Sequence, residues 1–130
     1  KPVVRRLNGK RGRLMSVQDV HAPERVVWDV IMDVGNYARM VDGVSSCHVY
    51  SSKRTPTGGR LVNARYRIRI PPAFGLEYNV KHIFEPLRHC MTFHLDYARR
   101  SQLTDMVGYW YVDQLPGADT WSRVGSSQVR

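Results

Sequence analysis

Two cysteine–histidine pairs are the residues whose chemistry stands out first. Cys47-His48 and His89-Cys90 together supply two thiols and two imidazoles, a permissible ligand set for zinc. The members of each pair are neighbours in sequence, and neighbours on an extended strand point to opposite faces of a sheet. The same geometry argues against a cysteine nucleophile with a histidine base, and no nucleophile elbow lies beside either pair. We therefore predict no metal site, no cofactor and no catalytic residue.

His82 is the one candidate for a buried titrating group. It shares the apolar face of an alternating segment, residues 76–84, with Tyr78 and Val80. An enzyme of the acid–base type needs such a group inside a cavity. A neutral core histidine held by hydrogen bonds is the alternative interpretation, and it is the one we favour.

Alternating strands supply the residues of a candidate ligand cavity. The clearest is residues 60–70, where apolar and aromatic side chains alternate with arginines. We predict that the apolar faces line a cavity through Tyr66, Ile68, Ile70, Tyr78, Val80, His82, Phe93, Leu95, Trp110 and Val112. The polar tips of Tyr66, Tyr78 and Trp110 fit a pocket in which a few polar groups orient an apolar ligand. Ordinary core packing is the alternative for each residue.

The opposite face of the same strands is basic. Arg65, Arg67 and Arg69 form a ridge, with Lys81 beside it, and the whole chain carries a net charge of +9. We predict a docking surface for an anionic membrane or an acidic protein surface, with a solvated outer face as the alternative. No nucleic-acid-binding signature accompanies the charge, so nucleic acid is not an expected partner.

The elements that must position these residues fit one domain. The chain has 130 residues, of which 42% are hydrophobic, and it contains no apolar run near the ~20 residues that cross a bilayer. Residues 1–13 are predicted to be a basic N-terminal arm, a transit remnant or docking tail, with a solvated end as the alternative. Residues 14–130 form the domain. Because the first residue is Lys1, we expect a processed protein or a fragment.

A short helical segment, residues 20–43, organises the rest of the domain. Pro23 is predicted to be the first helical residue, and a left-handed cap is expected at Gly35. An apolar stripe follows helical spacing through Val27, Val30, Ile31 and Val34. A second helical turn is expected over residues 36–41, before a turn at 42–43.

Strands are predicted before and after this segment, over residues 14–20, 44–51, 60–70, 76–84, 90–97, 106–115 and 120–129. The turn between the third and fourth is expected at residues 71–75. Short connections favour antiparallel pairing, so the fold class is α+β, a curved antiparallel sheet with helices on one face. Two short helices are thin cover for such a sheet. We expect that the remaining cover is missing from these residues or comes from another molecule.

The chain resembles the START-like superfamily of polyketide cyclase/dehydrase and lipid-transport proteins, which includes a coenzyme-Q-binding branch. The matching pieces are packing patterns: an entering strand at 17–22, a first helix at 22–30, the Asp-x-x-x-Tyr turn at 33–37 and Gly108-Tyr109-Trp110. Residues 91–112 further resemble plant and algal plastid members. The resemblance covers most of residues 17–124.

This resemblance implies the helix-grip fold. In that fold a seven-stranded antiparallel sheet wraps a long C-terminal helix, two short helices follow the first strand, and a tunnel between sheet and helix takes a hydrophobic ligand. The chain is expected to end about one strand and one helix early.

The leading hypothesis is non-catalytic binding of a lipid, quinone or other isoprenoid in this cavity. The alternative is an accessory subunit of a large organellar membrane-associated assembly, and a cyclase or dehydratase ranks third. The expected location is an organelle, a plastid before a mitochondrion.

Overall fold

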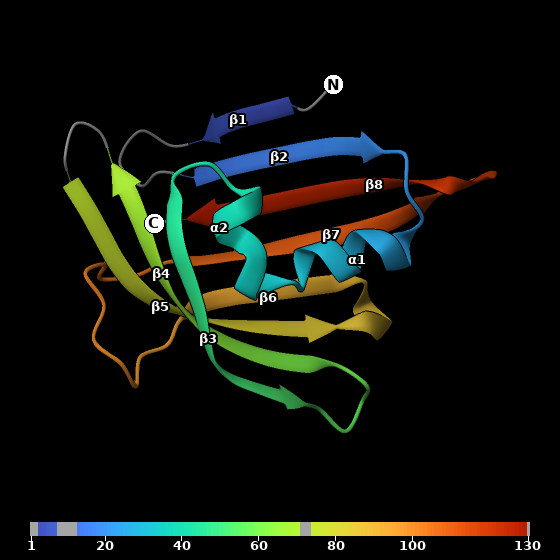
Figure 1. The fold of residues 1–130 in the computed structure, drawn as a ribbon. Coiled ribbons are helices and arrows are strands. Elements are labelled where there is room, and N and C mark those ends of the chain that lie inside the picture. The colour runs from blue at the N-terminus through green and yellow to red at the C-terminus, as the bar shows by residue number, and fades with distance from the viewer. Residues whose placement is uncertain (1–2, 8–12, 71–73, 130) are drawn as a thin grey trace.

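An antiparallel sheet dominates the computed structural model, which describes residues 3–7, 13–70 and 74–129 (Figure 1). Within these residues the sheet has eight strands. They are β1 (Val3–Leu7), β2 (Arg13–Val20), β3 (Val44–Arg54), β4 (Arg60–Ile70), β5 (Phe74–Glu85), β6 (Cys90–Leu95), β7 (Val107–Leu115) and β8 (Ala118–Val129). The helices are α1 (Glu24–Ile31) and α2 (Tyr37–Met40), with 3-10 turns η1 (Val34–Asn36) and η2 (Pro86–Arg88).

The first and last strands of the predicted domain, β2 and β8, are neighbours in the sheet. β3 to β8 follow one another as a meander, and β2 then pairs with β8, from Arg13 opposite Val129 to Val20 opposite Ser122. The predicted α+β class with a curved antiparallel sheet is confirmed. Strands β2 to β8 give seven antiparallel strands, the number that the resemblance implies. Within the described residues α1 is the longest helix.

The predicted basic arm contains a strand. Residues 3–7 form β1, which pairs antiparallel with β2 from Val3 opposite Val17 to Leu7 opposite Arg13. Pairing satisfies backbone groups along an edge of β2 that would otherwise be open. Residues 1–2 and 8–12 of the arm lie outside the described residues, as do residues 71–73 of the predicted turn.

The first helix begins and ends differently from the prediction. Pro23 has an extended backbone (φ −67°, ψ 157°) and precedes the helix instead of forming its first turn. The helix ends at Ile31, where the N–H of Met32 still bonds to the carbonyl of Trp28 at 2.8 Å. Gly35 lies in the 3-10 turn η1 and is not among the residues with positive φ, so it is no left-handed cap.

The buried face of α1 is also rotated from the predicted stripe. Val27, Trp28 and Ile31 are buried, whereas Val30 is 52% exposed. The indole of Trp28 packs against Phe84 with ring centroids 4.9 Å apart, and its N–H bonds to Glu24 at 3.2 Å. Because the helix turns Trp28 into the core, Val30 faces solvent. Val34 is buried as well, but it belongs to η1 and not to α1.

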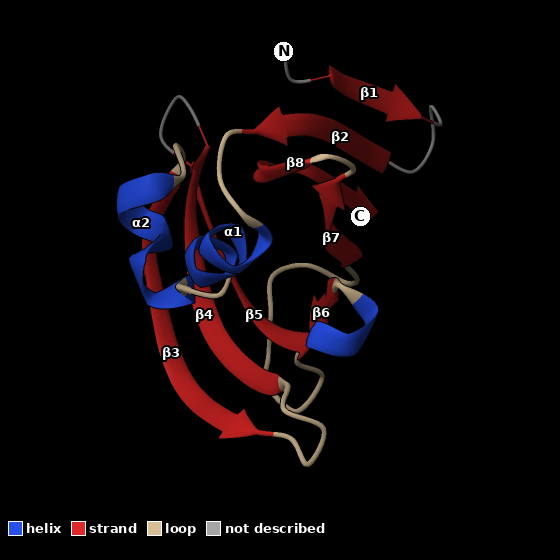
Figure 2. Cartoon of the chain, turned by 90° about the vertical axis from the view of Figure 1, so that its right-hand side faces the viewer, coloured by secondary structure: helices blue, strands red, loops and turns tan. Residues whose placement is uncertain are grey.

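The core lies between the concave face of the sheet and the helices. Figure 2 shows the sheet curling around α1, with α2 beside the start of β3. Val62, Ala64, Val80 and Val112 lie at its centre and are almost fully buried. None of the helices in the described residues has the length and apolar character that a membrane span requires.

Candidate functional site

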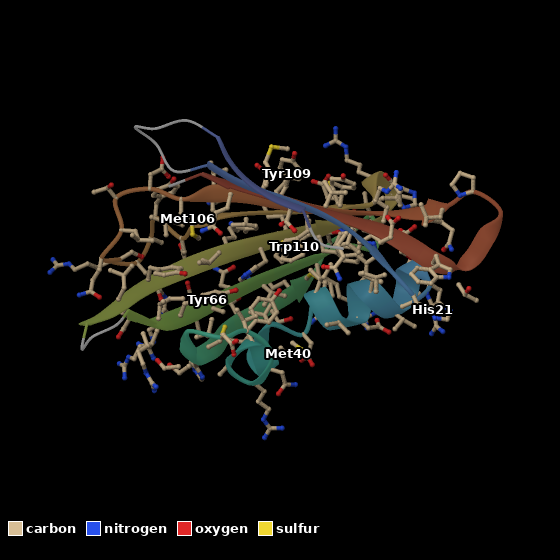
Figure 3. All side chains as sticks on the ribbon, turned by 90° about the horizontal axis from the view of Figure 1, so that it is seen from above. His21, Met40, Tyr66, Met106, Tyr109 and Trp110 are labelled. Atoms are coloured by element: carbon tan, nitrogen blue, oxygen red, sulfur yellow. The ribbon has the colours of Figure 1, made fainter. Side chains whose placement is uncertain are left out.

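A cavity of about 310 Å³ opens on the concave face, between α2 and the sheet. This volume lies at the lower end of the range for small-molecule sites, which runs from about 300 to 1,000 Å³. The lining is mostly apolar and aromatic: Tyr37, Val41, Asp42, Val44, Tyr66, Ile68, Tyr78, Val80, His82, Met91, Phe93, Met106, Trp110 and Gln128. Figure 3 shows Tyr66 and Trp110 on the side of the sheet that carries the helices, and Tyr109 on the other side.

The structure brings together most of the residues predicted to line a cavity. Those on its wall are Tyr66, Ile68, Tyr78, Val80, His82, Phe93 and Trp110. Leu95 and Val112 are buried, at 2% and 0% exposure, but they pack in the core away from the cavity wall. The side chain of Ile70 lies outside the described part of the structure.

Sequence reasoning did not assign the rest of the wall to the cavity. The missed residues are Tyr37, Val41, Asp42, Val44, Met91, Met106 and Gln128. Periodicity placed Met91 on the same face as Phe93, so that signal was present. Gln128 reaches the cavity because β8 pairs with β7, where it lies opposite Gly108. Gln128 is polar, so the apolar alternation that indicated the other cavity residues did not indicate it.

His82 and Tyr66 form a buried polar pair on the cavity wall. Nδ1 of His82 lies 2.8 Å from the carbonyl oxygen of Val62, and Nε2 lies 2.7 Å from the hydroxyl of Tyr66. The register of β4 with β5 sets this contact, because Val62 faces His82 across the two strands. Burial lowers the pKa of His82 to about 4, so the imidazole is neutral at physiological pH.

Two more tyrosines, Tyr78 and Tyr37, lie against this pair. The rings of Tyr66 and Tyr78 stack, with centroids 5.5 Å apart and planes 5° apart, and Tyr37 meets Tyr66 edge-on at 6.1 Å. The Tyr37 hydroxyl donates to the carbonyl of Ile31, which ties the cavity wall to the end of α1. Burial raises the pKa of both Tyr37 and Tyr66 well above the usual tyrosine value. Both phenols therefore stay neutral, and the acidic residue of the cavity lining is Asp42.

Gly108 shapes the wall beside Phe93. The two residues face each other across β6 and β7. A Cβ at position 108 would lie 2.3 Å from Cζ of Phe93 and 2.4 Å from the carbonyl oxygen of Ser127. Only glycine leaves room there, so the absence of a side chain at 108 allows the Phe93 ring to pack over β7.

The cysteines do not converge on a metal or a nucleophilic site. Cys47 lies in β3 and Cys90 in β6, and β4 and β5 lie between these two strands in the sheet. Burial raises the pKa of the Cys47 thiol to about 11, which leaves it protonated and unreactive. The described residues contain no group of three or more histidine, cysteine or acidic side chains that could hold a metal ion.

The basic ridge lies on the convex face, away from the cavity. Arg65, Arg67 and Arg69 are exposed, and Lys81 is half-buried on the same face of β5. Glu77 pairs with Arg67 at 2.9 Å and lies 3.9 Å from Arg65. Exposed ion pairs of this kind stabilise a fold little, so they leave these arginines available to a partner.

Comparison with known proteins places the chain by its fold. No protein-family model and no curated protein matches the sequence. Similar solved structures include an aromatase/cyclase from a Streptomyces species, with 14% identity and a TM-score of 0.73 over 92% of this chain and 67% of that one. A START superfamily protein from Mycobacterium smegmatis has 12% identity and a TM-score of 0.70, over 90% of this chain and 74% of that one.

A STAR-related lipid transfer protein from Xanthomonas axonopodis matches 99% of this chain and 74% of its own, with 17% identity and a TM-score of 0.69. Identities this low show a shared fold and leave activity open. The chain thus has the helix-grip fold of START-like proteins.

Proposed function

We propose that the chain binds a hydrophobic small molecule, a lipid, quinone or other isoprenoid, in the concave-face cavity. The observation that carries the proposal is the cavity itself, about 310 Å³ lined mainly by aromatic and aliphatic side chains. Moving apolar surface from water into such a site gains roughly 25 cal/mol per Å². The structurally similar lipid transfer protein supports this function by analogy.

We further propose that binding is not accompanied by catalysis. General acid–base chemistry needs a group that exchanges a proton near the working pH. The pKa of His82 is lowered to about 4, and that of Tyr66 is raised above its usual value, so neither does so. The similar aromatase/cyclase keeps a cyclase or dehydratase as the competing hypothesis. If cyclase or dehydratase activity were found and His82→Ala abolished it, that competing hypothesis would replace ours.

A pair of tryptophan substitutions on β4 tests ligand binding. Ile68 points into the cavity, whereas the adjacent Arg69 points outward from the convex face. We expect calorimetric titration with geraniol, a neutral isoprenoid alcohol, to give the same Kd for the natural protein and Arg69→Trp. Ile68→Trp fills the cavity and should weaken binding at least tenfold. Equal binding by all three proteins, or none by the natural one, would contradict the proposal.

A second candidate role, as an accessory subunit of a larger assembly, is favoured by the position of the basic ridge. Because Arg65, Arg67 and Arg69 lie opposite the cavity, an acidic protein surface could dock there without blocking a ligand. Arg67→Glu combined with Arg69→Glu should abolish co-sedimentation with a large complex in sucrose gradients. Migration of the natural protein as a free monomer would contradict this role. The organellar location, plastid before mitochondrion, stays a prediction.

A further inference from the structure

The hydrogen bonds of His82 fix the direction of the hydroxyl of Tyr66. The carbonyl oxygen of Val62 can only accept, so Nδ1 of His82 must carry the proton of that 2.8 Å contact. A neutral imidazole has one N–H, so Nε2 must accept. The Tyr66 hydroxyl, 2.7 Å away, is therefore the donor, and its hydrogen points at His82 rather than into the cavity.

This chain of bonds leaves the cavity with an acceptor. The oxygen of Tyr66 keeps lone-pair capacity, while its hydrogen and both ring nitrogens of His82 are already used. The thiol of Cys47 is another polar neighbour of the same hydroxyl, and a thiol is only a weak donor. Tyr66 and His82 are both packed within the core, because their exposed fractions are only 8% and 2%.

We propose that the cavity selects a neutral ligand that brings a hydrogen-bond donor, an alcohol or a phenol, over one that offers only a carbonyl or ether oxygen. This inference rests on the proposed function and names its ligand class. A ligand hydroxyl completes the bonding of the Tyr66 oxygen. A carbonyl or ether in the same place would set two acceptors against each other, and no hydrogen bond would form between them. For a quinone-type ligand, the site takes the reduced quinol and disfavours the oxidised quinone.

Two probes of nearly the same shape test this selection. 2-Naphthol carries the donor, and 2-methoxynaphthalene has it capped with a methyl group. Calorimetric titration at pH 7 gives the ratio of their two Kd values. We expect 2-naphthol to bind more tightly to the natural protein, although the ether is the more apolar molecule. In Tyr66→Phe the preference for 2-naphthol should fall by roughly three- to tenfold, the worth of one hydrogen bond.

A control variant and the possible outcomes distinguish failure of the donor selection from failure of ligand binding in the cavity. Tyr109→Phe removes a hydroxyl from the other side of the sheet and should keep the natural ratio (Figure 3). Equal or tighter binding of the ether by the natural protein overturns the selection and leaves cavity binding intact. The same ratio in Tyr66→Phe as in the natural protein also overturns it. If neither probe binds the natural protein, the selection and the proposed function fail together.

Discussion

At the scale of single residues, the proposed ligand selection depends on the buried pair of His82 and Tyr66. Burial of His82 among apolar side chains removes the water that would hydrate a charged imidazole. The neutral imidazole keeps hydrogen bonds to the carbonyl of Val62 and the hydroxyl of Tyr66. The protein therefore holds His82 neutral, with a pKa of about 4. Such an arrangement makes folding stability depend on pH.

We predict that His82 makes the protein less stable as the pH falls from about 6.5 to about 4. In this window the unfolded chain protonates the imidazole, with an ordinary pKa near 6.5, while the folded protein does not. The loss should approach about 3 kcal/mol in the free energy of unfolding. Urea unfolding at several pH values measures it, and His82→Asn should show a shallower pH dependence. Parallel curves for the two proteins would contradict a neutral buried histidine.

A second prediction at this scale concerns Gly108. Gly108→Ala forces a methyl group against Phe93 and the backbone of Ser127, at distances that real side chains do not adopt. We expect a loss of about 1–3 kcal/mol in unfolding free energy and weaker binding of geraniol, because the cavity wall must move.

The control for this substitution is Gly35→Ala, whose new Cβ would lie 3.8 Å from Val49 in ordinary contact. Its φ is not positive, so the change should be nearly neutral. A large loss of unfolding free energy in Gly35→Ala, with none in Gly108→Ala, would contradict the roles given to both glycines.

At the scale of elements, α1 packs on the core through Val27, Trp28 and Ile31, and Trp28 is the largest of these side chains. Trp28 joins α1 to β5 through Phe84, and the hydroxyl of Tyr37 joins α2 to the end of α1. A helix of eight residues is too short to be stable alone, so this packing maintains it.

Trp28→Ala should therefore lower the free energy of unfolding by about 3–5 kcal/mol, because it removes a buried aromatic ring and leaves a cavity. Val30→Ala on the same helix should change it by less than about 0.5 kcal/mol, since Val30 is 52% exposed. Thermal or urea unfolding of both variants measures the difference. Similar losses of unfolding free energy in the two variants would mean that Val30 packs in the core, as the sequence predicted.

The sequence predicts elements well where one face is apolar and the other is charged throughout. β4 has the predicted bounds because Arg65, Arg67 and Arg69 alternate strictly with apolar residues. β3 continues to Arg54, beyond the apolar pattern, because its last residues pair with the start of β4. β1 was missed since its charges, Arg5 and Arg6, suggested a solvated arm, whereas pairing with β2 determines its structure.

At the scale of the whole molecule, the candidate site depends on contacts between distant parts of the chain. The predicted wall came from β4 to β7, each read from its own alternation. Other parts of the wall are supplied by Val41 and Val44 near α2 and by Gln128 near the end of β8. The pairing of β8 with β7 and the placement of α2 bring these residues together. Local patterns could not reveal that assembly.

The five methionines give the most direct test of the central claim, that the concave face encloses a hydrophobic ligand. Met91 and Met106 line the cavity, whereas Met40 is 45% exposed on α2. With ¹³C-labelled methionine methyl groups, NMR titration with geraniol should shift the signals of Met91 and Met106 together, saturably, and leave that of Met40 nearly unchanged. A saturable shift of Met40 alone, or no shift at Met91 and Met106, would contradict ligand binding in this cavity.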